Sequence, residues 1–219
     1  GLGDVYKRQV MTNIAQYAFS LHNKVTVLSD GSKHSSLDFD NKCKFDIYRF
    51  DQIKFLRKRI KSSFANNFLK KNKINLIFFD SWKSLESFNF NTDAKKICLA
   101  HGNEILKLSN KDRIINSFNK ADYIIYNSEF TKNKTIKNFK SLKKIKNTII
   151  YPAFIKKNQK IKINKKKYDL CTVARLELRK GHHLVFEAMS ILKNQYNILI
   201  KYAILGDGPD LSRLKDLVI

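Results

Sequence analysis

Two short stretches near the carboxyl end of the sequence combine fixed positive charge with glycine. The first stretch, ARLELRKG, contains Arg175 and ends at Lys180 and Gly181, and the second, LGDGP, follows at 205–209. Cationic side chains neutralise phosphate oxygens, and a glycine lets a ligand come close to the backbone. The residues that we expect to hold a diphosphate are Arg175, Lys180, Gly181, Gly206, Asp207 and Gly208.

The residues around these stretches predict the elements that must position them. Apolar runs at 170–174 and 202–205 predict two strands, the first ending at Arg175 and the second at the glycines. Between the runs, apolar residues recur with a helical period, at Leu184, Ala188, Ile191 and Leu192. A strand, a helix and a strand in this order form a βαβ unit with parallel strands, and ligands bind beyond the carboxyl ends of such strands. We therefore expect the cations and the glycines at one edge of a parallel sheet.

The block ARLELRKG, with LGDGP about one helix and one strand later, resembles the signature of family 4 glycosyltransferases, which have the GT-B fold. The pieces LAHGNE at 99–104 and ADYIIYNSEFTK at 121–132 resemble upstream parts of the same family. The resemblance implies an α/β, GT-B-like protein with two Rossmann-like parallel-sheet domains, in which Arg175 and Lys180 grip the diphosphate of the sugar donor. One departure is Ala174, where the family usually has glycine. The alternative, that both cations are solvated loop residues, is the weaker interpretation because three motifs occur in family order.

A second set of candidate residues follows the apolar run at 96–100, which predicts a buried strand. His101 comes directly after this run, beside Gly102 and near Glu104. The resemblance implies that His101 lines the cleft between the domains and contacts the transferred sugar or the acceptor, so His101 is the catalytic candidate. A structural histidine is the alternative. Ser128 is expected to be the N-cap of a helix at 129–139, and the family helix with this start lies near the cleft.

An Asp-x-Asp motif, Asp38 to Asp40, could chelate a divalent cation with its two carboxylates. It lies in a polar stretch at 31–43 that predicts a loop, so we interpret both residues as solvated turn residues. In the predicted transferase, Arg175, Lys180 and the dipole of the helix after Gly181 would stabilise the departing diphosphate. We therefore expect no metal and no cofactor, and the nucleoside-diphosphate sugar enters as a substrate.

The sequence divides into four segments. Residues 1–9 resemble a non-native leader, and their Gly-x-Gly does not predict a phosphate loop because no strand precedes it. Residues 10–152 predict an acceptor-side Rossmann-like domain, residues 153–167 a lysine-rich linker, and residues 168–219 the start of a nucleotide-sugar-binding domain.

Compared with the family, the first strand with its glycine loop and the acidic Glu-x7-Glu motif are missing from the two ends. We therefore expect a fragment, truncated at both ends, that is inactive alone. We also expect it to be poorly stable, because a sheet of two strands is marginal in water. The sheet face that would lack a covering layer is formed by Val173, Tyr202 and Ile204.

The longest predicted helix, at 51–71, is amphipathic and basic. Its apolar face is formed by Ile53, Leu56, Ile60, Phe64 and Phe68. Its other face holds Lys54, Arg57, Lys58 and Lys61. The usual interpretation is a helix that docks on the core and leaves a solvated basic face. The alternative is contact with an anionic membrane surface.

The 219 residues include 43 Lys and Arg against 19 Asp and Glu, which gives a formal net charge of +24. Such an excess favours polyanionic partners, although Lys, Asn and Ile in joint abundance are also expected of an AT-rich genome. No apolar stretch reaches the roughly 20 residues that span a bilayer, and no signal-peptide pattern occurs. Three cysteines lie far apart, and Cys98 and Cys171 fall in apolar runs, so we expect buried free thiols and a reducing cytoplasm.

The first functional hypothesis is a retaining glycosyltransferase of hexosyltransferase type. It would move a sugar from a nucleoside-diphosphate donor to a hydroxyl of a glycan or lipid-linked acceptor, in cell-surface glycan or glycolipid synthesis. It would be cytoplasmic, with a peripheral position on the inner face of the plasma membrane left open. A basic nucleic-acid-binding protein and a GT-B-fold nucleotide-sugar epimerase are the alternatives. The former rests on charge alone, and the HGNE and RLELRKG blocks fit a transferase better than an epimerase.

Overall fold

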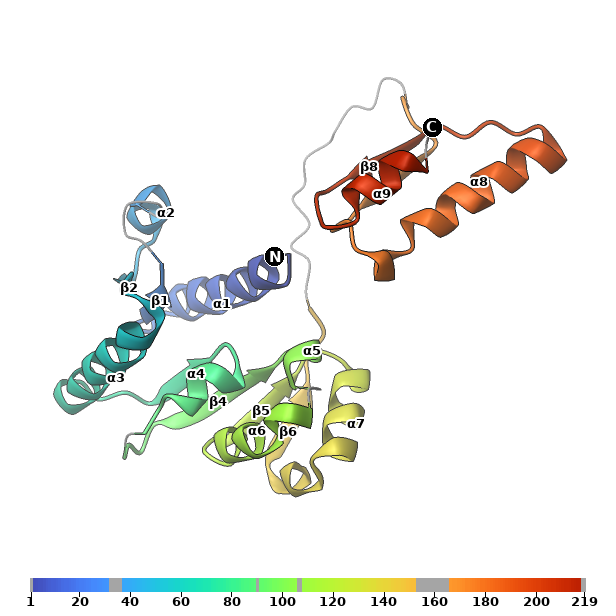
Figure 1. Cartoon of the computed structure of the whole chain (residues 1–219). Helices are drawn as coiled ribbons and strands as arrows, with labels where there is room; N and C mark the ends of the chain where they lie inside the picture. Colours follow the sequence, from blue (N-terminus) through green and yellow to red (C-terminus); the bar gives the residue numbers. More distant parts are fainter. Residues whose placement is uncertain (1, 32–36, 90, 106–107, 153–165, 218–219) are drawn as a thin grey trace. The chain divides into compact units, whose positions relative to one another are not determined.

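The computed structural model describes residues 2–31, 37–89, 91–105, 108–152 and 166–217. The chain forms two compact units (Figure 1), of which one is Tyr6–Phe154 and the other combines Ile155–Ile219 with Gly1–Val5. Most of the linker predicted at 153–167 lies outside the described residues. Among the helices of the described ranges, none is long and apolar enough to cross a membrane.

The centre of the first unit is a parallel sheet of four strands in the order β3-β4-β5-β6. The strands are β3 (Leu76–Phe79), β4 (Lys95–Ala100), β5 (Tyr123–Tyr126) and β6 (Lys146–Ile149). The continuous apolar sequences LIFF and YIIY are typical of parallel strands that are covered on both faces. Ala100 pairs with Tyr126 in the register, so β4 and β5 end at the same level of the sheet.

Short helices connect and cover these strands. They are α4 (Trp82–Glu86), α5 (Gly102–Ile105), α6 (Lys111–Phe118) and α7 (Glu129–Asn138), with the 3-10 turns η2 (Leu108–Asn110) and η3 (Lys140–Lys144). Large side chains from these helices and from the strands are fully buried against one another, among them Trp82, Leu85, Ile114, Phe118, Ile124, Tyr126, Phe139 and Leu142. Each such burial contributes about 1.5–3 kcal/mol. This core fixes the carboxyl ends of the four strands, where the candidate residues of this unit lie.

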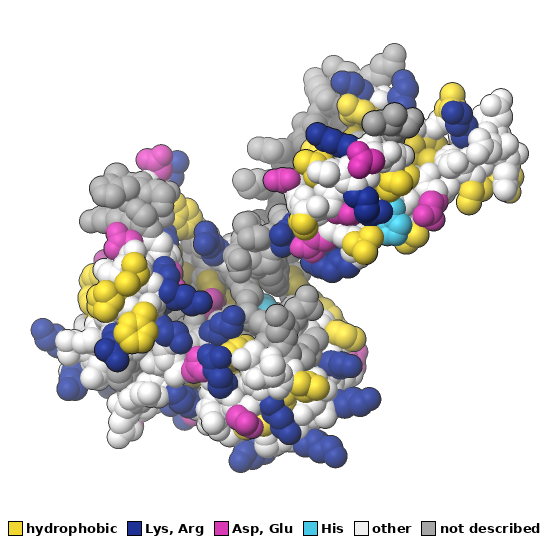
Figure 2. All heavy atoms as spheres, in the orientation of Figure 1, with side chains coloured by type: hydrophobic (Ala, Val, Ile, Leu, Met, Phe, Trp, Pro, Cys, Tyr) yellow, Lys and Arg dark blue, Asp and Glu magenta, His cyan; other side chains and the backbone are white. Residues whose placement is uncertain are grey.

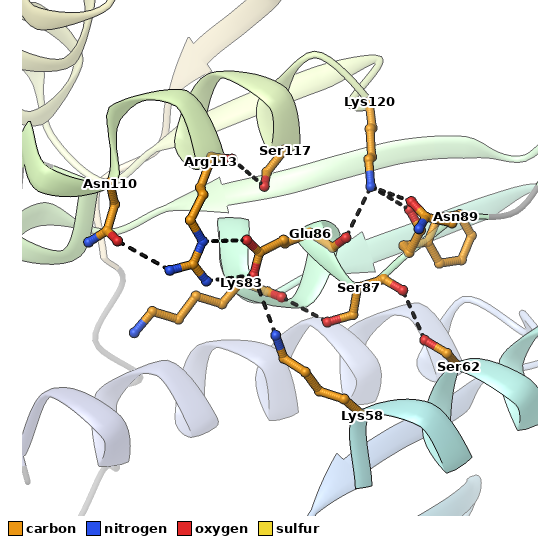
Figure 3. A network of polar contacts seen from close by, with 11 residues as sticks. Lys58, Ser62, Lys83, Glu86, Ser87, Asn89, Asn110, Arg113, Ser117 and Lys120 are labelled. Atoms are coloured by element: carbon orange, nitrogen blue, oxygen red, sulfur yellow. Dashed lines mark hydrogen bonds and ion pairs between the residues drawn. The ribbon is translucent and has the colours of Figure 1, made fainter. Parts of the chain in front are cut away.

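A polar network at the surface joins α4 and α6 to α3 (Lys54–Lys71) (Figure 3). Glu86, the last residue of α4, accepts hydrogen bonds from Nε of Arg113 at 2.7 Å and from Nη2 at 3.0 Å. These bonds hold the pKa of Glu86 below its usual value. Nζ of Lys58 on α3 lies 3.4 Å from the same carboxylate, and Nζ of Lys120 donates to the carbonyls of Glu86 at 3.0 Å and of Phe88 at 2.9 Å. The network is therefore a structural link between three helices.

The amino-terminal part of the first unit contains a second, two-stranded parallel sheet. Helix α1 (Leu2–Ser20) precedes β1 (Thr26–Asp30), and α2 (Leu37–Lys42) precedes β2 (Asp46–Phe50), which pairs with β1. The predicted loop at 31–43 therefore contains a helix at its end, and residues 32–36 lie outside the described residues.

Asp40 is not a solvated turn residue, so that interpretation is wrong. Both oxygens of its carboxylate accept hydrogen bonds from Arg49, at 2.7 and 3.0 Å. The side chains of both residues are only 15% exposed. The partner on β2 lies nine residues away in the sequence, and local polarity alone does not reveal it. The ion pair between Asp40 and Arg49 thus links α2 to strand β2.

Helix α3 packs on the sheet through its carboxyl-terminal half. The ring of Phe64 lies 4.6 Å from that of Tyr48 and 5.6 Å from that of Phe50. The residues predicted on the same face nearer the start, Ile53, Leu56 and Ile60, are exposed. The interpretation of 51–71 as a core-docked helix is therefore wrong for its first half, whose predicted apolar face is exposed. Figure 2 shows hydrophobic side chains gathered at the surface over β2 and α3.

The second unit is the predicted βαβ unit with one further helix. It consists of β7 (Leu170–Val173), η4 (Leu178–Lys180), α8 (His182–Tyr196), β8 (Tyr202–Leu205) and α9 (Leu211–Asp216), and β7 pairs with β8 in parallel. Helix α8 packs on one sheet face, where the ring of Phe186 meets that of Tyr202 edge to face at 6.0 Å.

The opposite face of this two-stranded sheet is exposed. Val173 is 74% exposed, and Cys171, two residues earlier on the same face of β7, is exposed as well. Tyr202 and Ile204 lie on the face that α8 covers, so the prediction that they share an uncovered face with Val173 is wrong. The prediction of a buried thiol at Cys171 is therefore wrong, whereas Cys98 is buried as predicted. An apolar run indicates a strand, but it does not reveal how many of the strand's faces are covered.

Candidate functional site

The loops that follow β7 and β8 run side by side. Val173 pairs with Leu205 at the last position of the register, so both strands end at one edge. Beyond that edge the amide of Leu176 donates to the carbonyl of Asp207 at 3.0 Å, and the amide of Asp210 donates to the carbonyl of Leu176 at 3.0 Å. The two motifs that the sequence placed at one edge are therefore in direct backbone contact.

Two glycines make this contact possible. A Cβ atom on Gly206 would lie 1.8 Å from the carbonyl oxygen of Ala174, and one on Gly208 would lie 2.3 Å from the carbonyl oxygen of Leu176. Both distances are far below any real Cβ contact, so a side chain at either position would force the loops apart. The glycines in LGDGP thus have a packing role between the loops, which is separate from their predicted role toward a ligand.

Gly181 ends the first loop and starts helix α8. Its φ of +71° lies in the left-handed region, which glycine adopts without strain. Lys180, directly before it, is exposed and closes the 3-10 turn η4. Gly181 therefore sets the direction in which α8 leaves the loop. The amino end of α8 directly follows Lys180 and Gly181, two of the residues predicted to bind the diphosphate.

The positive charge of the first loop is arranged around Glu177, which sequence reasoning did not single out. Nη1 of Arg175 lies 2.8 Å from one carboxylate oxygen of Glu177, and Nε of Arg179 lies 2.7 Å from the other. The alternation Arg-x-Glu-x-Arg at 175–179 is the signal that could have revealed this cluster. In the described residues, Lys180 has no ion-pair partner.

His182 is a second residue of this loop region that the motifs did not indicate. It is buried at the start of α8, and its Nε2 lies 3.4 Å from the carbonyl oxygen of Arg175. Asp210, which precedes α9, has its pKa lowered mainly by hydrogen bonds from Arg213, and also by the nearby His183 and His182. The burial of His182 could not be predicted from the sequence, because its contact is with a backbone carbonyl, which every residue type has.

The candidate residues of the first unit lie at the carboxyl edge of its four-stranded sheet. His101 follows β4 and is 7% exposed, and Gly102 begins α5. The side chain of the predicted cleft candidate Glu104 is not among those that the structure describes. The amide of Asn127, which follows β5, donates to the carbonyl of Ala100 at 3.4 Å, so the segments after β4 and β5 are neighbours.

Ser128 is the N-cap of α7, as predicted. Its Oγ accepts a hydrogen bond from the amide of Thr131 at 3.2 Å and lies 2.9 Å from Oγ1 of the same residue. The predicted candidates thus form two groups, with His101, Gly102 and Ser128 in the first unit and Arg175, Lys180 and the glycines in the second. Across the described ranges, no group of three or more His, Cys, Asp or Glu side chains could hold a metal ion.

Comparison with known proteins agrees with the motifs. Residues 153–219 match the family model of glycosyl transferases group 1. Over 142 residues, which are 56% of this chain, the sequence is 33% identical to the uncharacterized glycosyltransferase MJ1069 of Methanocaldococcus jannaschii, and the match covers 36% of that protein. These two matches confirm the predicted resemblance and do not favour the nucleic-acid-binding or the epimerase alternative.

Two solved structures share the fold of this chain. HepE of Anabaena, in complex with UDP and glucose, has a TM-score of 0.55 at 16% identity, and the match covers 89% of this chain and 56% of that one. A mutant of S. aureus TarM, in complex with fondaparinux, α-GlcNAc-glycerol and UDP, has a TM-score of 0.51 at 18% identity, covering 72% of this chain and 34% of that one. These likenesses confirm the predicted α/β, GT-B-like fold with parallel sheets.

Proposed function

Because the chain has the fold of GT-B glycosyltransferases and its residues 153–219 match glycosyl transferases group 1, we propose that the protein transfers a sugar from a nucleoside-diphosphate donor to an acceptor hydroxyl. The chain spans 36% of the length of the curated relative, so the activity is proposed for the protein that contains it. The observation that carries the proposal is the direct contact between the ARLELRKG and LGDGP loops at one edge of the second unit.

In this proposal, Arg175 and Lys180 bind the diphosphate of the donor. Both follow β7, and the loop that carries them is fixed to the backbone of Asp207 and Asp210. The amino end of α8 adds a positive dipole directly after Gly181. Gly206, Asp207 and Gly208 would complete the site with exposed backbone, since Gly206 and Asp207 are exposed.

The chemistry requires positive charge where the diphosphate leaves. The acceptor oxygen forms a bond to the anomeric carbon, the bond from that carbon to the diphosphate breaks, and its electron pair stays on the phosphate oxygen while the acceptor releases its proton. Arg175 and Lys180 would stabilise that oxygen as it becomes negative, a type of contribution that is often the largest in an enzyme. We propose that the transfer retains the anomeric configuration and needs no metal ion, and that His101 contacts the sugar or the acceptor.

The nature of the substrates is part of the proposal. HepE was crystallised with UDP and glucose, and TarM with UDP and α-GlcNAc-glycerol, so a UDP-sugar is the first donor to test. GDP- and ADP-sugars should be tested beside it, because the described residues do not identify the base. The acceptor that we propose is a glycan or a lipid-linked glycan of the cell surface.

We also propose that the protein works at the cytoplasmic side of an anionic membrane. Ile53, the N-cap of α3, and Phe55 and Leu56 in its first turn are 72%, 66% and 46% exposed, next to cations. The basic face is partly neutralised, because Arg57 and Lys61 pair with Asp30 at 3.8 and 2.6 Å. Exposed apolar side chains with cations around them suit the boundary between headgroups and acyl chains.

The test of the proposed activity is release of nucleoside diphosphate from a nucleotide sugar by a protein that contains this chain, with a lipid-linked glycan as acceptor. Replacement of Arg175 by Ala should lower kcat about 10²- to 10³-fold, as expected for loss of one preorganised electrostatic group. Lys193, an exposed cation on α8, offers the matched control, and Lys193→Ala should leave turnover unchanged. If both Arg175→Ala and Lys180→Ala keep a turnover within about threefold of wild type, the loss is far smaller than expected and the assignment is refuted.

A further inference from the structure

Glu177 binds both arginines of the ARLELRKG loop. One of its carboxylate oxygens lies 2.8 Å from Nη1 of Arg175, and the other lies 2.7 Å from Nε of Arg179. The side chain of Glu177 is 19% exposed, whereas those of Arg175 and Arg179 are 43% and 61% exposed. The carboxylate is therefore the sheltered member of the cluster, and the two guanidinium groups form its solvent-facing part.

The backbone of the loop holds Glu177 in place. Its amide donates to the carbonyl of Arg175 at 3.0 Å, and its carbonyl accepts from the amide of Lys180 at 2.8 Å. The preceding residue, Leu176, is buried and bonded through its backbone to Asp207 and Asp210. The backbone of Glu177 is therefore held in place by hydrogen bonds within its loop, and the side chains of the two arginines extend from the same loop.

Glu177 uses one nitrogen of each guanidinium group. An arginine has three nitrogens with five N–H donors, so two nitrogens of Arg175 and two of Arg179 remain. In the part of the chain that the structure describes, these arginines have no side-chain partner other than Glu177. A free arginine must be ordered when it binds a ligand, and this ordering lowers affinity. Because the carboxylate of Glu177 already holds one nitrogen of each guanidinium group, part of this ordering has taken place before the ligand binds.

We propose that Glu177 is a positioning residue that presents Arg175 and Arg179 together to the diphosphate of the donor, with Arg179 as a third phosphate-binding cation beside Arg175 and Lys180. This inference rests on the proposed donor site. The opposing effect is repulsion between the carboxylate and the diphosphate. Positioning outweighs it here, because each guanidinium keeps two nitrogens for phosphate and the ligand does not have to displace Glu177.

The test is titration of the 219-residue chain with inorganic pyrophosphate and with UDP in a calorimeter at fixed ionic strength. Glu177→Ala and Glu177→Gln should each weaken binding of both probes about fivefold to tenfold, which corresponds to ordering one or two long side chains. Glu187 on α8 is exposed and has no ion-pair partner in the described ranges, so Glu187→Ala is the matched control and should bind as wild type.

A double-mutant cycle separates positioning from a general loss of stability. In an Arg179→Ala background, Glu177→Ala should weaken pyrophosphate binding by a smaller factor, because one of the two arginines that Glu177 orders is absent. A merely structural role would lower the melting temperature and leave the affinity of the folded chain unchanged, and this result would overturn the proposal. Equal factors in both backgrounds would overturn it as well, since Glu177 would then not act through Arg179.

Two further results would also overturn the proposal. Tighter binding by Glu177→Gln would mean that the carboxylate competes with the diphosphate for the arginines. Failure of the wild-type chain to bind either probe would remove the proposed donor site itself. The latter result differs from a failure of this inference alone, in which the wild type binds and the Glu177 variants bind equally well.

Discussion

At the scale of single residues, Gly206 and Gly208 make the clearest prediction about stability. A Cβ on either would collide with a carbonyl oxygen of the neighbouring loop, at 1.8 and 2.3 Å. Gly206→Ala and Gly208→Ala should therefore each destabilise the second unit by about 1–3 kcal/mol, the usual cost of overpacking. Thermal unfolding measures this loss. Gly102→Ala is the control, since a Cβ there meets nothing within 4 Å, and equal melting of all three variants would contradict the loop contact.

His101 makes the residue-scale prediction for the first unit. It is almost fully buried at the end of β4, a position that suits either a core histidine or a substrate contact. We expect His101→Ala to lower sugar transfer on the order of 10²-fold while the protein stays folded, as for a group that acts on the reacting atoms. Turnover should be compared for folded fractions of equal concentration. A lower melting temperature with unchanged turnover would assign His101 to the core.

At the scale of elements, α3 makes a prediction about partners. Its exposed first half should bind anionic liposomes at low salt and release them at high salt, because each Lys or Arg near such a surface contributes about 1 kcal/mol and salt screens this attraction. Liposome flotation measures the binding. Ile53→Glu with Leu56→Glu should abolish it, whereas Phe130→Glu, at a residue 69% exposed on α7, should not. Equal binding to neutral and anionic liposomes would contradict the prediction.

The elements themselves could largely be predicted from the sequence. The strands at 96–100, 123–126 and 202–205 are found within a residue or so of their expected bounds, because short continuous apolar runs are typical of strands in a parallel sheet. Contacts between elements were not predictable, and Asp40 pairs with Arg49 on another element. The sharing of Glu177 between two arginines is a local contact, and the alternation Arg-x-Glu-x-Arg could have indicated it. Burial also depends on which elements cover a residue. Ile53 is exposed although the helical periodicity predicts it in the core, and Cys171 is exposed although it lies in an apolar run.

At the scale of the whole molecule, the two units should differ in local stability. The described sheet of the second unit has two strands and an exposed face, whereas the central sheet of the first unit, β3-β4-β5-β6, has four strands and a buried core. Amides of β7 and β8 should therefore exchange with solvent at least about tenfold faster than those of β4 and β5, since small sheets open more easily. Hydrogen exchange followed by mass spectrometry measures this difference. Equal protection in both sheets would contradict it.

The charge of the whole molecule is a weaker guide to function than the two loops. The formal net charge is +24, but Figure 2 shows Lys and Arg side chains scattered over the visible face rather than gathered in one stripe. A scattered excess attracts polyanions in general and selects none of them. The specific signal is local, namely Arg175 and Lys180 beside the glycines of the second loop.

The central claim is that this edge of the second unit binds a diphosphate, and titration of the chain with UDP and with uridine tests it most directly, with GDP and ADP in parallel. We predict that at least one nucleoside diphosphate binds much more tightly than its nucleoside. Arg175→Ala and Lys180→Ala should each weaken that binding about tenfold or more, the worth of one hydrogen bond to a charged group, while Lys193→Ala leaves it unchanged. Equal affinity for nucleoside and nucleoside diphosphate, or wild-type binding by both loop variants, would contradict the account.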